Sequence, residues 1–261
     1  MIRLMIPVEA YDMKSMLKLT VLFCLCLTLA LPSACAESSL RGYTAQDGYV
    51  YLTLGTYPQT AEGEIRPILW RVLTVEEDRA YLCSEYILLA HRIHPDDKEY
   101  IAFGADLKQT EIWDYMNNEM LPAYFTEEER SLIVDTPEFG QLFLLSREDL
   151  NNRDIGFGTD TARKAWGTDY AFNNTDERFE NLFRYSNARG AHSPYWTRTQ
   201  STTHNYGGVC TKAEGNLGYI RVVVADEGCR PACYLDLTAL TVTGGSGTMD
   251  NPYTVGAVAA E

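Results

Sequence analysis

The sequence lacks the short motifs that identify several large enzyme classes. It contains no glycine-rich phosphate loop, no G-x-S-x-G nucleophile elbow and no H-E-x-x-H zinc motif. These absences argue against a P-loop nucleotidase, an α/β-hydrolase and a zincin protease. Acidic residues with the spacing of an EF-hand calcium loop are also missing. We therefore interpret the acidic side chains in the middle of the chain as surface charge, namely Asp149, Asp154, Asp160, Asp169, Asp176 and Glu177.

The chain is poor in basic residues, with 22 Lys and Arg against 36 Asp and Glu. The first 36 residues hold three of the basic and two of the acidic side chains. The remainder therefore has 19 basic and 34 acidic residues and a net charge of −15. Phosphate backbones and anionic lipid headgroups repel such a chain. We predict no nucleic-acid partner, and membrane association only if a lipid is attached at Cys35.

Histidine is scarce as well, with four residues in the chain. Two of them form the pattern His91-x-x-His94 next to Asp96 and Asp97, which has some metal-ligand character. A structural metal site needs four organised ligands, and this segment offers neither a complete set nor a helix to hold one. We therefore predict a solvated loop here, with no metal and no cofactor.

The apolar run Leu19–Leu31 near the start has thirteen residues, which is too short to span a bilayer. Basic residues precede it and the small residues 34–36 follow it. This order is typical of a secretory signal peptide. We predict a signal peptide over residues 1–36, with a mis-assigned start, because Met13 or Met16 begins the pattern better.

An anchored form is the alternative. Leu31–Cys35 resembles a bacterial lipoprotein box, but Pro32 stands where that box usually has Leu. Cleavage after Ala36 needs no such exception. We therefore expect a protein that is secreted or on the cell surface.

The remaining 225 residues are enough for one large domain. We expect a loose leader at 37–47, a single α+β domain at 48–242 and an extended C-terminal tail at 243–261. Alternation of apolar and polar residues predicts strands, and capping residues followed by helical spacing predict helices. The expected strands are 48–54, 68–75, 80–89, 142–145 and 238–242, and the expected helices are 110–122, 127–134 and 147–151.

The chain is organised around the stretch from Tyr195 to Leu237. β-Branched and aromatic residues alternate there with polar residues between Gly, Asn and Asp turn signals. This pattern predicts the central strands of an antiparallel sheet. The preceding segment 152–193 is irregular and rich in aromatics, and such loops often carry binding function.

Four cysteines remain after residue 36, namely Cys83, Cys210, Cys229 and Cys233. An even number in an exported chain predicts two disulfides. Three pairings can be drawn, and we favour Cys210–Cys229 with Cys83–Cys233. In one extended strand Cys229 and Cys233 would share a face but lie too far apart to bond to each other. Free buried thiols are the alternative.

Separated sequence blocks resemble a bacterial domain family of unknown function that is common in exported proteins of gut Firmicutes. The similarity extends from about Gly48 to Leu237. The blocks are Leu54–Thr60, Ile68–Leu73, Leu82–Leu88, Trp113–Asn118, Phe125–Glu129, Phe143–Ser146, Trp196–Arg198 and Gly228–Leu237.

The Trp-x-Arg block, the following Gly-rich hairpin and Arg-Pro-Ala also resemble the end of C-type-lectin-like folds, including the formylglycine-generating enzymes. This resemblance implies an α+β fold with a twisted antiparallel sheet, two flanking helices and long loops. It implies no activity, because function depends on sites and not on folds.

An aromatic ring beside arginines can stack on a sugar or peptide and bind a carboxylate. On this basis we predict a ligand site formed by Tyr195, Trp196, Arg198, His204, Asn205 and Arg230. The alternative is structural, because aromatic and arginine clusters also pin sheets together.

The preferred function is therefore an extracellular binding module without enzymatic activity, whose partner is a glycan or a protein. Loops 152–193 and 199–218 would supply the contact surface. One alternative is a copper- or thiol-dependent modifying enzyme that uses Cys229 and Cys233, although their spacing and strand context favour structural roles. A purely structural surface domain is the other alternative.

Overall fold

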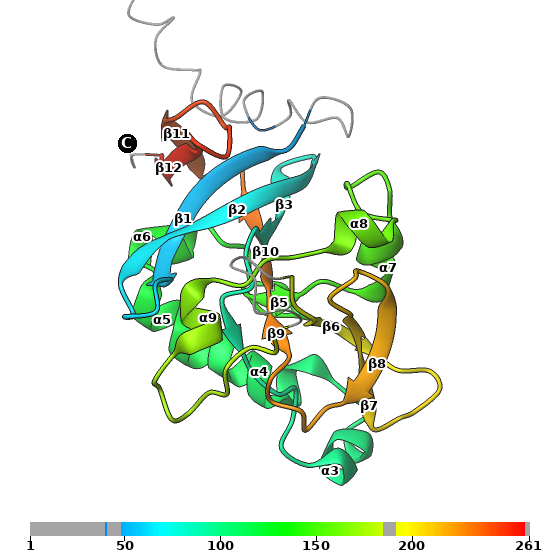
Figure 1. Ribbon diagram of the computed structural model, residues 1–261. Coiled ribbons are helices and arrows are strands. Elements are labelled where there is room, and N and C mark those ends of the chain that lie inside the picture. Colours follow the sequence, from blue (N-terminus) through cyan, green and yellow to red (C-terminus); the bar gives the residue numbers. More distant parts are fainter. Residues whose placement is uncertain (1–39, 41–47, 185–191, 259–261) are drawn as a thin grey trace, which may run out of the picture.

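A computed structural model describes Leu40, residues 48–184 and residues 192–258 (Figure 1). The predicted signal peptide lies outside the described residues, and so does the loose leader except for Leu40, which is buried in the core. Among the described residues, no helix is both long and apolar enough to cross a bilayer.

The first sheet has seven strands in the order β11-β12-β1-β2-β3-β10-β5. All neighbours in it are antiparallel except β1 and β12, which run parallel. The segment expected to be a tail thus contributes β12 to this sheet. The strands are β1 (Val50–Pro58), β2 (Ile65–Glu76), β3 (Arg79–Ser84), β5 (Phe143–Leu144), β10 (Pro231–Asp236), β11 (Leu240–Gly244) and β12 (Tyr253–Ala257).

The second sheet has five strands in the order β4-β9-β6-β7-β8, with β6 and β9 parallel. Its strands are β4 (Leu89–Ala90), β6 (Tyr195–Gln200), β7 (Gly207–Thr211), β8 (Leu217–Arg221) and β9 (Gly228–Cys229). The expected mixture of helices and sheet is confirmed. The expectation of one antiparallel sheet is wrong, because the stretch from Tyr195 to Leu237 divides between two sheets.

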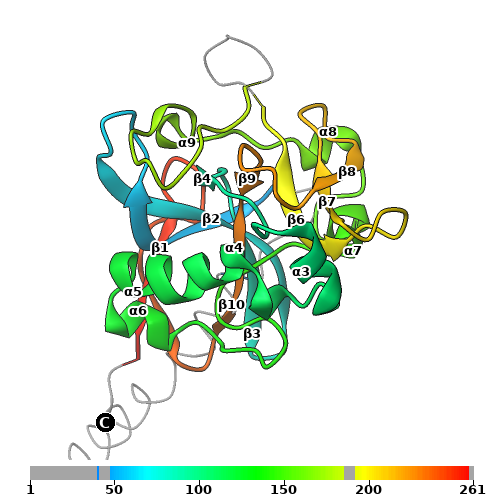
Figure 2. The same ribbon diagram turned by 90° about the horizontal axis from the view of Figure 1, so that it is seen from below.

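The helices are short. They are α3 (Asp97–Ala102), the 3-10 helix η1 (Leu107–Gln109), α4 (Glu111–Asp114), the π-helical turn η2 (Tyr115–Met120), α5 (Leu121–Tyr124), α6 (Glu127–Ser131), α7 (Arg147–Asn151), α8 (Asp160–Arg163) and α9 (Asp169–Asn173). Figure 2 shows the continuous run α4-η2-α5 crossing in front of the first sheet. Pro122 was expected to end this helix, but the helix continues to Tyr124. Pro122 lies at the start of α5, directly after the π-helical turn η2.

Both faces of the first sheet are buried. Along β3, Ala80 and Leu82 belong to a core that includes Ile112 and Met116 of the α4-η2-α5 run. Tyr81 and Cys83 alternate with them and belong to a second core under α7. This alternation follows from the two-residue period of a strand, and it explains why strand segments of this chain carry large residues on both faces.

The helix expected at 127–134 begins with a capping box formed by Thr126 and Glu129. Glu129 Oε1 also accepts a hydrogen bond of 2.8 Å from the amide of Gly55. Gly55 has a φ of +64°, and a Cβ there would lie 2.4 Å from the ring of Phe125. The chain was expected to leave the sheet at Gly55, but β1 continues to Pro58 after a register shift. β12 pairs only with Leu52 and Thr53, so Pro58 lies where β1 has an open edge.

The predicted disulfides are absent, and Cys83, Cys210, Cys229 and Cys233 are buried free thiols. In the β3–β10 pair Cys83 stands opposite Ala232, and Cys233 stands opposite Leu82. Paired residues share a face and the next residue points to the other face. The thiols of Cys83 and Cys233 therefore belong to different cores.

The second predicted bridge fails for a different reason. Cys210 of β7 stands opposite Trp196 of β6, and Cys229 belongs to β9 on the other side of β6. Two strand spacings amount to roughly 9–10 Å, whereas a disulfide needs Cα atoms within about 7 Å. Strand β6, which contains Trp196, thus separates these two cysteines.

Candidate functional site

Three of the predicted ligand residues are buried and hold backbone in place. Trp196 Nε1 donates to the carbonyl of His91 at 2.7 Å. Tyr195 Oη donates to the carbonyl of Arg163 at 2.8 Å. Arg230 Nε donates to the carbonyl of Ser84 at 2.7 Å, and its side chain is 1% exposed. These side chains form no exposed platform for a ligand.

Arg198 also points inward. Its Nη1 donates to the carbonyl of Leu144 at 2.5 Å and lies 3.1 Å from the carboxylate of Asp149. Its guanidinium stacks over the ring of Phe139 at 4.5 Å. Arg198 therefore joins β6 to β5 and α7.

His204 and Asn205 lie at the surface, in the turn between β6 and β7. The ring of His204 stacks on Tyr219 of β8, with centroids 4.3 Å apart. The predicted ligand residues thus do not form one site. Tyr195, Trp196 and Arg230 are buried, and Arg198 is half-buried. His204 and Asn205 lie at the surface, where His204 stacks on an exposed tyrosine.

The charged cleft is elsewhere. A cavity of about 250 Å³ is lined by Ala90, His91, Arg92, Glu111, Glu177, Arg178, Phe179, Glu180 and Ala225. We call it the His91 cleft. Its lining comes from the end of β4, the start of α4, the segment after α9 and the turn before β9.

His91 is 8% exposed, and its ring lies between Tyr115 and Phe179, with centroid distances of 5.5 and 5.7 Å. Its Nδ1 lies 2.7 Å from the carbonyl of Arg92, so Nδ1 carries the proton. Burial lowers the pKa of His91, which keeps the ring neutral. Nε2 has no hydrogen-bond partner among the described residues, and it is therefore a free acceptor on the wall of the cleft.

Arg92 and Glu111 form a forked ion pair at one side of the cleft. Arg92 Nε and Nη2 donate to the two carboxylate oxygens at 2.5 and 3.0 Å. These hydrogen bonds lower the pKa of Glu111. The pair fixes the start of α4 against the end of β4.

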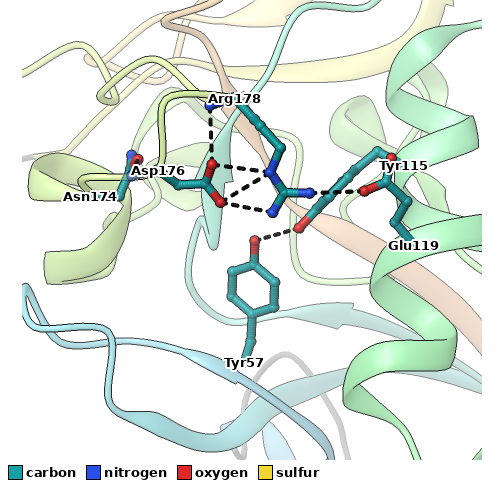
Figure 3. Close-up of polar contacts among 6 residues, drawn as sticks. All are labelled: Tyr57, Tyr115, Glu119, Asn174, Asp176 and Arg178. Carbon is teal, nitrogen blue, oxygen red and sulfur yellow. Dashed lines mark hydrogen bonds and ion pairs between the residues drawn. The ribbon is translucent and has the colours of Figure 1, made fainter.

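Arg178 forms a second ion-pair group, which Figure 3 shows between two carboxylates. Its Nη2 lies 2.7 Å from Asp176 Oδ2, and its Nη1 lies 3.1 Å from Glu119 Oε2. Hydrogen bonds from Arg178 lower the pKa of Asp176. Asn174 Oδ1 accepts the amide of Asp176 at 3.1 Å and fixes the turn.

The π-helical turn η2 brings two of these groups together. Tyr115 at its start contacts His91 and Phe179, and its Oη lies 2.8 Å from Tyr57 Oη of β1 (Figure 3). Glu119, one turn later, binds Arg178. Burial raises the pKa of both tyrosines, so both hydroxyls stay protonated. π-Helical turns occur frequently at functional sites.

The His91 cleft carries more negative than positive charge. Arg92 and Arg178 are matched by Glu111, Asp176 and Glu119. Glu177 and Glu180 line the cleft as well, and their carboxylates have no ion-pair partner among the described residues. The lining of the cleft therefore includes two exposed acidic residues without an ion-pair partner, a neutral histidine and the ring of Phe179.

The histidine and aspartate pattern at 91–97 is not assembled as a metal site. His94 packs on Phe103 and its Nδ1 bonds the backbone of Asp96. Asp96 caps α3, and Asp97 pairs with Arg221. Among the described residues, no three His, Cys, Asp or Glu side chains come together in a group that could hold a metal ion.

Sequence reasoning missed most of the cleft. His91 was considered only as a metal ligand, and Arg92 and Glu111 were not considered as site residues. Arg178 and Phe179 lie in loop 152–193, which was expected to supply a contact surface, but neither was singled out. They come from three segments with no shared spacing. The only local signal is the mixed run Asp176–Glu180, in which charges surround an aromatic residue.

Residues 139–237 match the model of a family described as a domain of unknown function (DUF6273). This match supports the presence of an uncharacterised domain family in part of the chain. The matched range is shorter than the resemblance found in the sequence, which begins at about Gly48. The matched range holds Arg178 and Phe179 but not His91, Arg92 or Glu111. Comparison with curated proteins and with solved structures finds no match.

Proposed function

We propose that the protein is an exported binding module whose extracellular ligand places a primary amine in the His91 cleft. The observation that carries this proposal is that two acidic residues without an ion-pair partner, Glu177 and Glu180, line the same cleft as the neutral His91, whose Nε2 is a free acceptor. An ammonium group has three donors and no acceptor. It would satisfy these acceptors and reduce the charge excess of the cleft.

The aromatic rings support the same ligand chemistry. Phe179 lines the cleft and packs edge-on against Tyr115 at 4.9 Å. The guanidinium of Arg178 already lies 5.1 Å from the centroid of the Phe179 ring, within the distance of about 6 Å at which a ring face attracts a cation by about 0.5–2 kcal/mol. The mature net charge of −15 also favours encounter with cationic ligands. Lysine-containing peptides and amino sugars both present such an amine.

The test compares amine-bearing probes with their acetylated forms. The peptide arm uses a short peptide with a central lysine, or with N-acetyl-lysine at that position. The glycan arm uses chitosan oligosaccharides and their fully N-acetylated counterparts. We expect binding of the amine form in one arm, weakened at least about tenfold by acetylation and weakened further by salt. Equal affinity for amine and acetylated probes, or binding of neither, would contradict the proposal.

Variants assign the binding to the cleft. Glu177→Gln and Glu180→Gln should each weaken amine binding about three- to tenfold, which corresponds to about 0.7–1.4 kcal/mol. Glu214→Gln is the matched control, because Glu214 is exposed in the turn between β7 and β8 and does not line the cleft. An equal effect of Glu214→Gln would point to general charge attraction.

The thiol-enzyme alternative has little physical support. Cys229 and Cys233 are fully buried, and burial raises the pKa of both thiols. A reactive cysteine needs a stabilised thiolate and access to its substrate. The purely structural alternative corresponds to the outcome in which neither probe class binds.

The C-type-lectin-like arrangement belongs to the same proposal. Two mainly antiparallel sheets with long intervening segments support it at the level of architecture. Superposition of an experimental structure on C-type-lectin domains tests it, and a different strand order would reject it.

A further inference from the structure

A second hollow lies on the outer face of β7 and β8, next to the turn that contains His204. It has a volume of about 300 Å³ and is lined by residues of α7, β7, β8 and the turn after β6. We call it the Tyr219 hollow. Its lining shares no residue with the His91 cleft. Its volume is near the lower limit of about 300–1,000 Å³ for small-molecule sites.

Strand register explains the apolar floor. Tyr219 stands opposite Val209 in the β7–β8 pair, and Leu217 is two residues before Tyr219. These three side chains therefore share one face of the sheet. Ile220 and Cys210 point to the other face and pack in the first core. The hollow is thus built on a rigid sheet.

The ring of Tyr219 is exposed but held in one orientation. It is 44% exposed, and His204 stacks on it with an interplanar angle of 20°. Tyr219 Oη lies 3.4 Å from His204 Nε2, and His204 Nδ1 lies 3.1 Å from Thr203 Oγ1. An aromatic ring that is oriented before binding loses less entropy when a ligand stacks on it.

Polar groups border this apolar surface. Ser201, Thr202 and Thr203 line the hollow with three hydroxyls. Arg147 also lines it, and its amide donates to Thr199 Oγ1 at 2.9 Å, which fixes the start of α7. The guanidinium of Arg147 has no hydrogen bond or ion pair among the described residues. Arg147 is exposed, so the hollow has a free forked donor among its lining residues and no acidic residue among them.

We propose that the Tyr219 hollow binds an acidic sugar residue, a hexuronate within a saccharide. The apolar C–H face of the sugar ring packs on Tyr219 above the floor of Val209 and Leu217. Its hydroxyls exchange hydrogen bonds with the residues 201–203. Its carboxylate accepts the two parallel hydrogen bonds that a guanidinium supplies. A neutral sugar would leave Arg147 unused, and an amine would be repelled by it.

The test uses the full chain and four probes, namely tetragalacturonate, a glucuronate-containing tetrasaccharide and the neutral galactose and glucose tetrasaccharides. Ligand-observed NMR at about 5 mM probe detects dissociation constants as weak as about 1 mM. We expect at least one acidic probe to bind about tenfold or more tightly than its neutral counterpart. Failure of both acidic probes to bind, or equal binding of acidic and neutral probes, overturns the proposal.

Two substitutions separate the contributions. Arg147→Gln should remove the preference for the acidic probe and leave neutral binding unchanged. Arg153→Gln is its matched control, because Arg153 is also exposed but does not line the hollow. Tyr219→Thr should weaken both probe types about tenfold, whereas Tyr219→Phe, which keeps the ring, should have little effect. Thr is compatible with an edge strand, and circular dichroism checks that the fold is retained.

This proposal stands apart from the amine site. Arg147→Gln and Tyr219→Thr should leave the binding of lysine or chitosan probes unchanged. Glu177→Gln should leave hexuronate binding unchanged. If the wild type binds hexuronate but no amine probe, only the proposed function of the His91 cleft is rejected. If it binds an amine probe but no hexuronate, only the proposal for the Tyr219 hollow is rejected.

Discussion

The indole Nε1 of Trp196 donates a hydrogen bond of 2.7 Å to the carbonyl of His91. Trp196 is fully buried in the centre of the second sheet, and His91 lines the charged cleft. The residue predicted to contact a ligand therefore supports the residue that lines the cleft. Its effect on binding should be indirect, through the position of the imidazole ring.

Trp196→Phe tests this support. The substitution leaves the buried carbonyl of His91 without its donor, which costs about 1–3 kcal/mol of unfolding free energy. It should also weaken any ligand of the His91 cleft, because the backbone beneath the ring can shift. Urea unfolding measures the first effect. Trp166→Phe is the control, since Trp166 is 42% exposed, and it should change stability by less than about 0.5 kcal/mol.

Arg71 and Glu85 form a buried forked ion pair, with both hydrogen bonds at 2.7 Å and both residues under 10% exposed. Arg71→Met should lower stability by about 3–5 kcal/mol, because the carboxylate of Glu85 is left buried and unpaired. Adding Glu85→Gln should recover part of this loss. A double-mutant cycle by urea unfolding measures the coupling, and strict additivity would contradict the interpretation.

Glu227 makes stability fall as pH rises. Burial raises its pKa from 4.5 to about 7, nearby Asp226 adds to this and Lys212 opposes it, and Oε2 has no partner among the described residues. The folded state therefore holds a proton between pH 4.5 and 7 that the unfolded state has released. Over this window each pH unit removes up to about 1.4 kcal/mol of stability.

The comparison of wild type with Glu227→Gln isolates this effect. Relative to the wild type, the variant should gain about 2–3 kcal/mol between pH 5 and pH 8, measured by urea unfolding at both values. Glu214→Gln removes an exposed carboxylate. It serves as the control and should show no such trend. A pH-independent difference for Glu227→Gln would mean that the carboxyl titrates normally.

The four buried cysteines should remain reduced in the folded protein. Alkylation in denaturant without a reducing agent, followed by peptide mass spectrometry, should label Cys83, Cys210, Cys229 and Cys233. In the native state none should react, because all four are buried. A cross-linked peptide that joins Cys210 to Cys229 would show that β6 does not separate them.

Local features of the fold could be predicted from the sequence. Thr126 and Ser146 cap the helices expected from 127 and from 147, and the strands expected at 68–75 and 80–89 pair as the β2–β3 hairpin. Each depends on residues a few positions apart, for which the physics of capping and turns is sufficient. The end of helix α6 at Ser131, earlier than expected, results from tertiary contacts of Leu132 and Ile133 in the core.

The non-local features could not be predicted in the same way. Cys229 and Cys233 were interpreted as one strand, but they lie in β9 and β10 of different sheets. The disulfide prediction rested on the even number of cysteines, and the choice of pairing used that assumption of one face. The His91 cleft combines β4, α4 and a loop, and no periodicity in the sequence connects these segments. The positions of the cysteines and the composition of the cleft both depend on strand order and on where the loops lie, which the local sequence does not specify.

The parallel pairing of β1 with β12 has a mechanical consequence. Leu52 stands beside Tyr253 and Thr53 beside Thr254. A force that pulls residue 50 and residue 257 in opposite directions would act along both strands, so their cross-strand hydrogen bonds would be sheared together and not opened one at a time. Resistance to stretching would then depend on this short pair and on the β1–β2 ladder behind it.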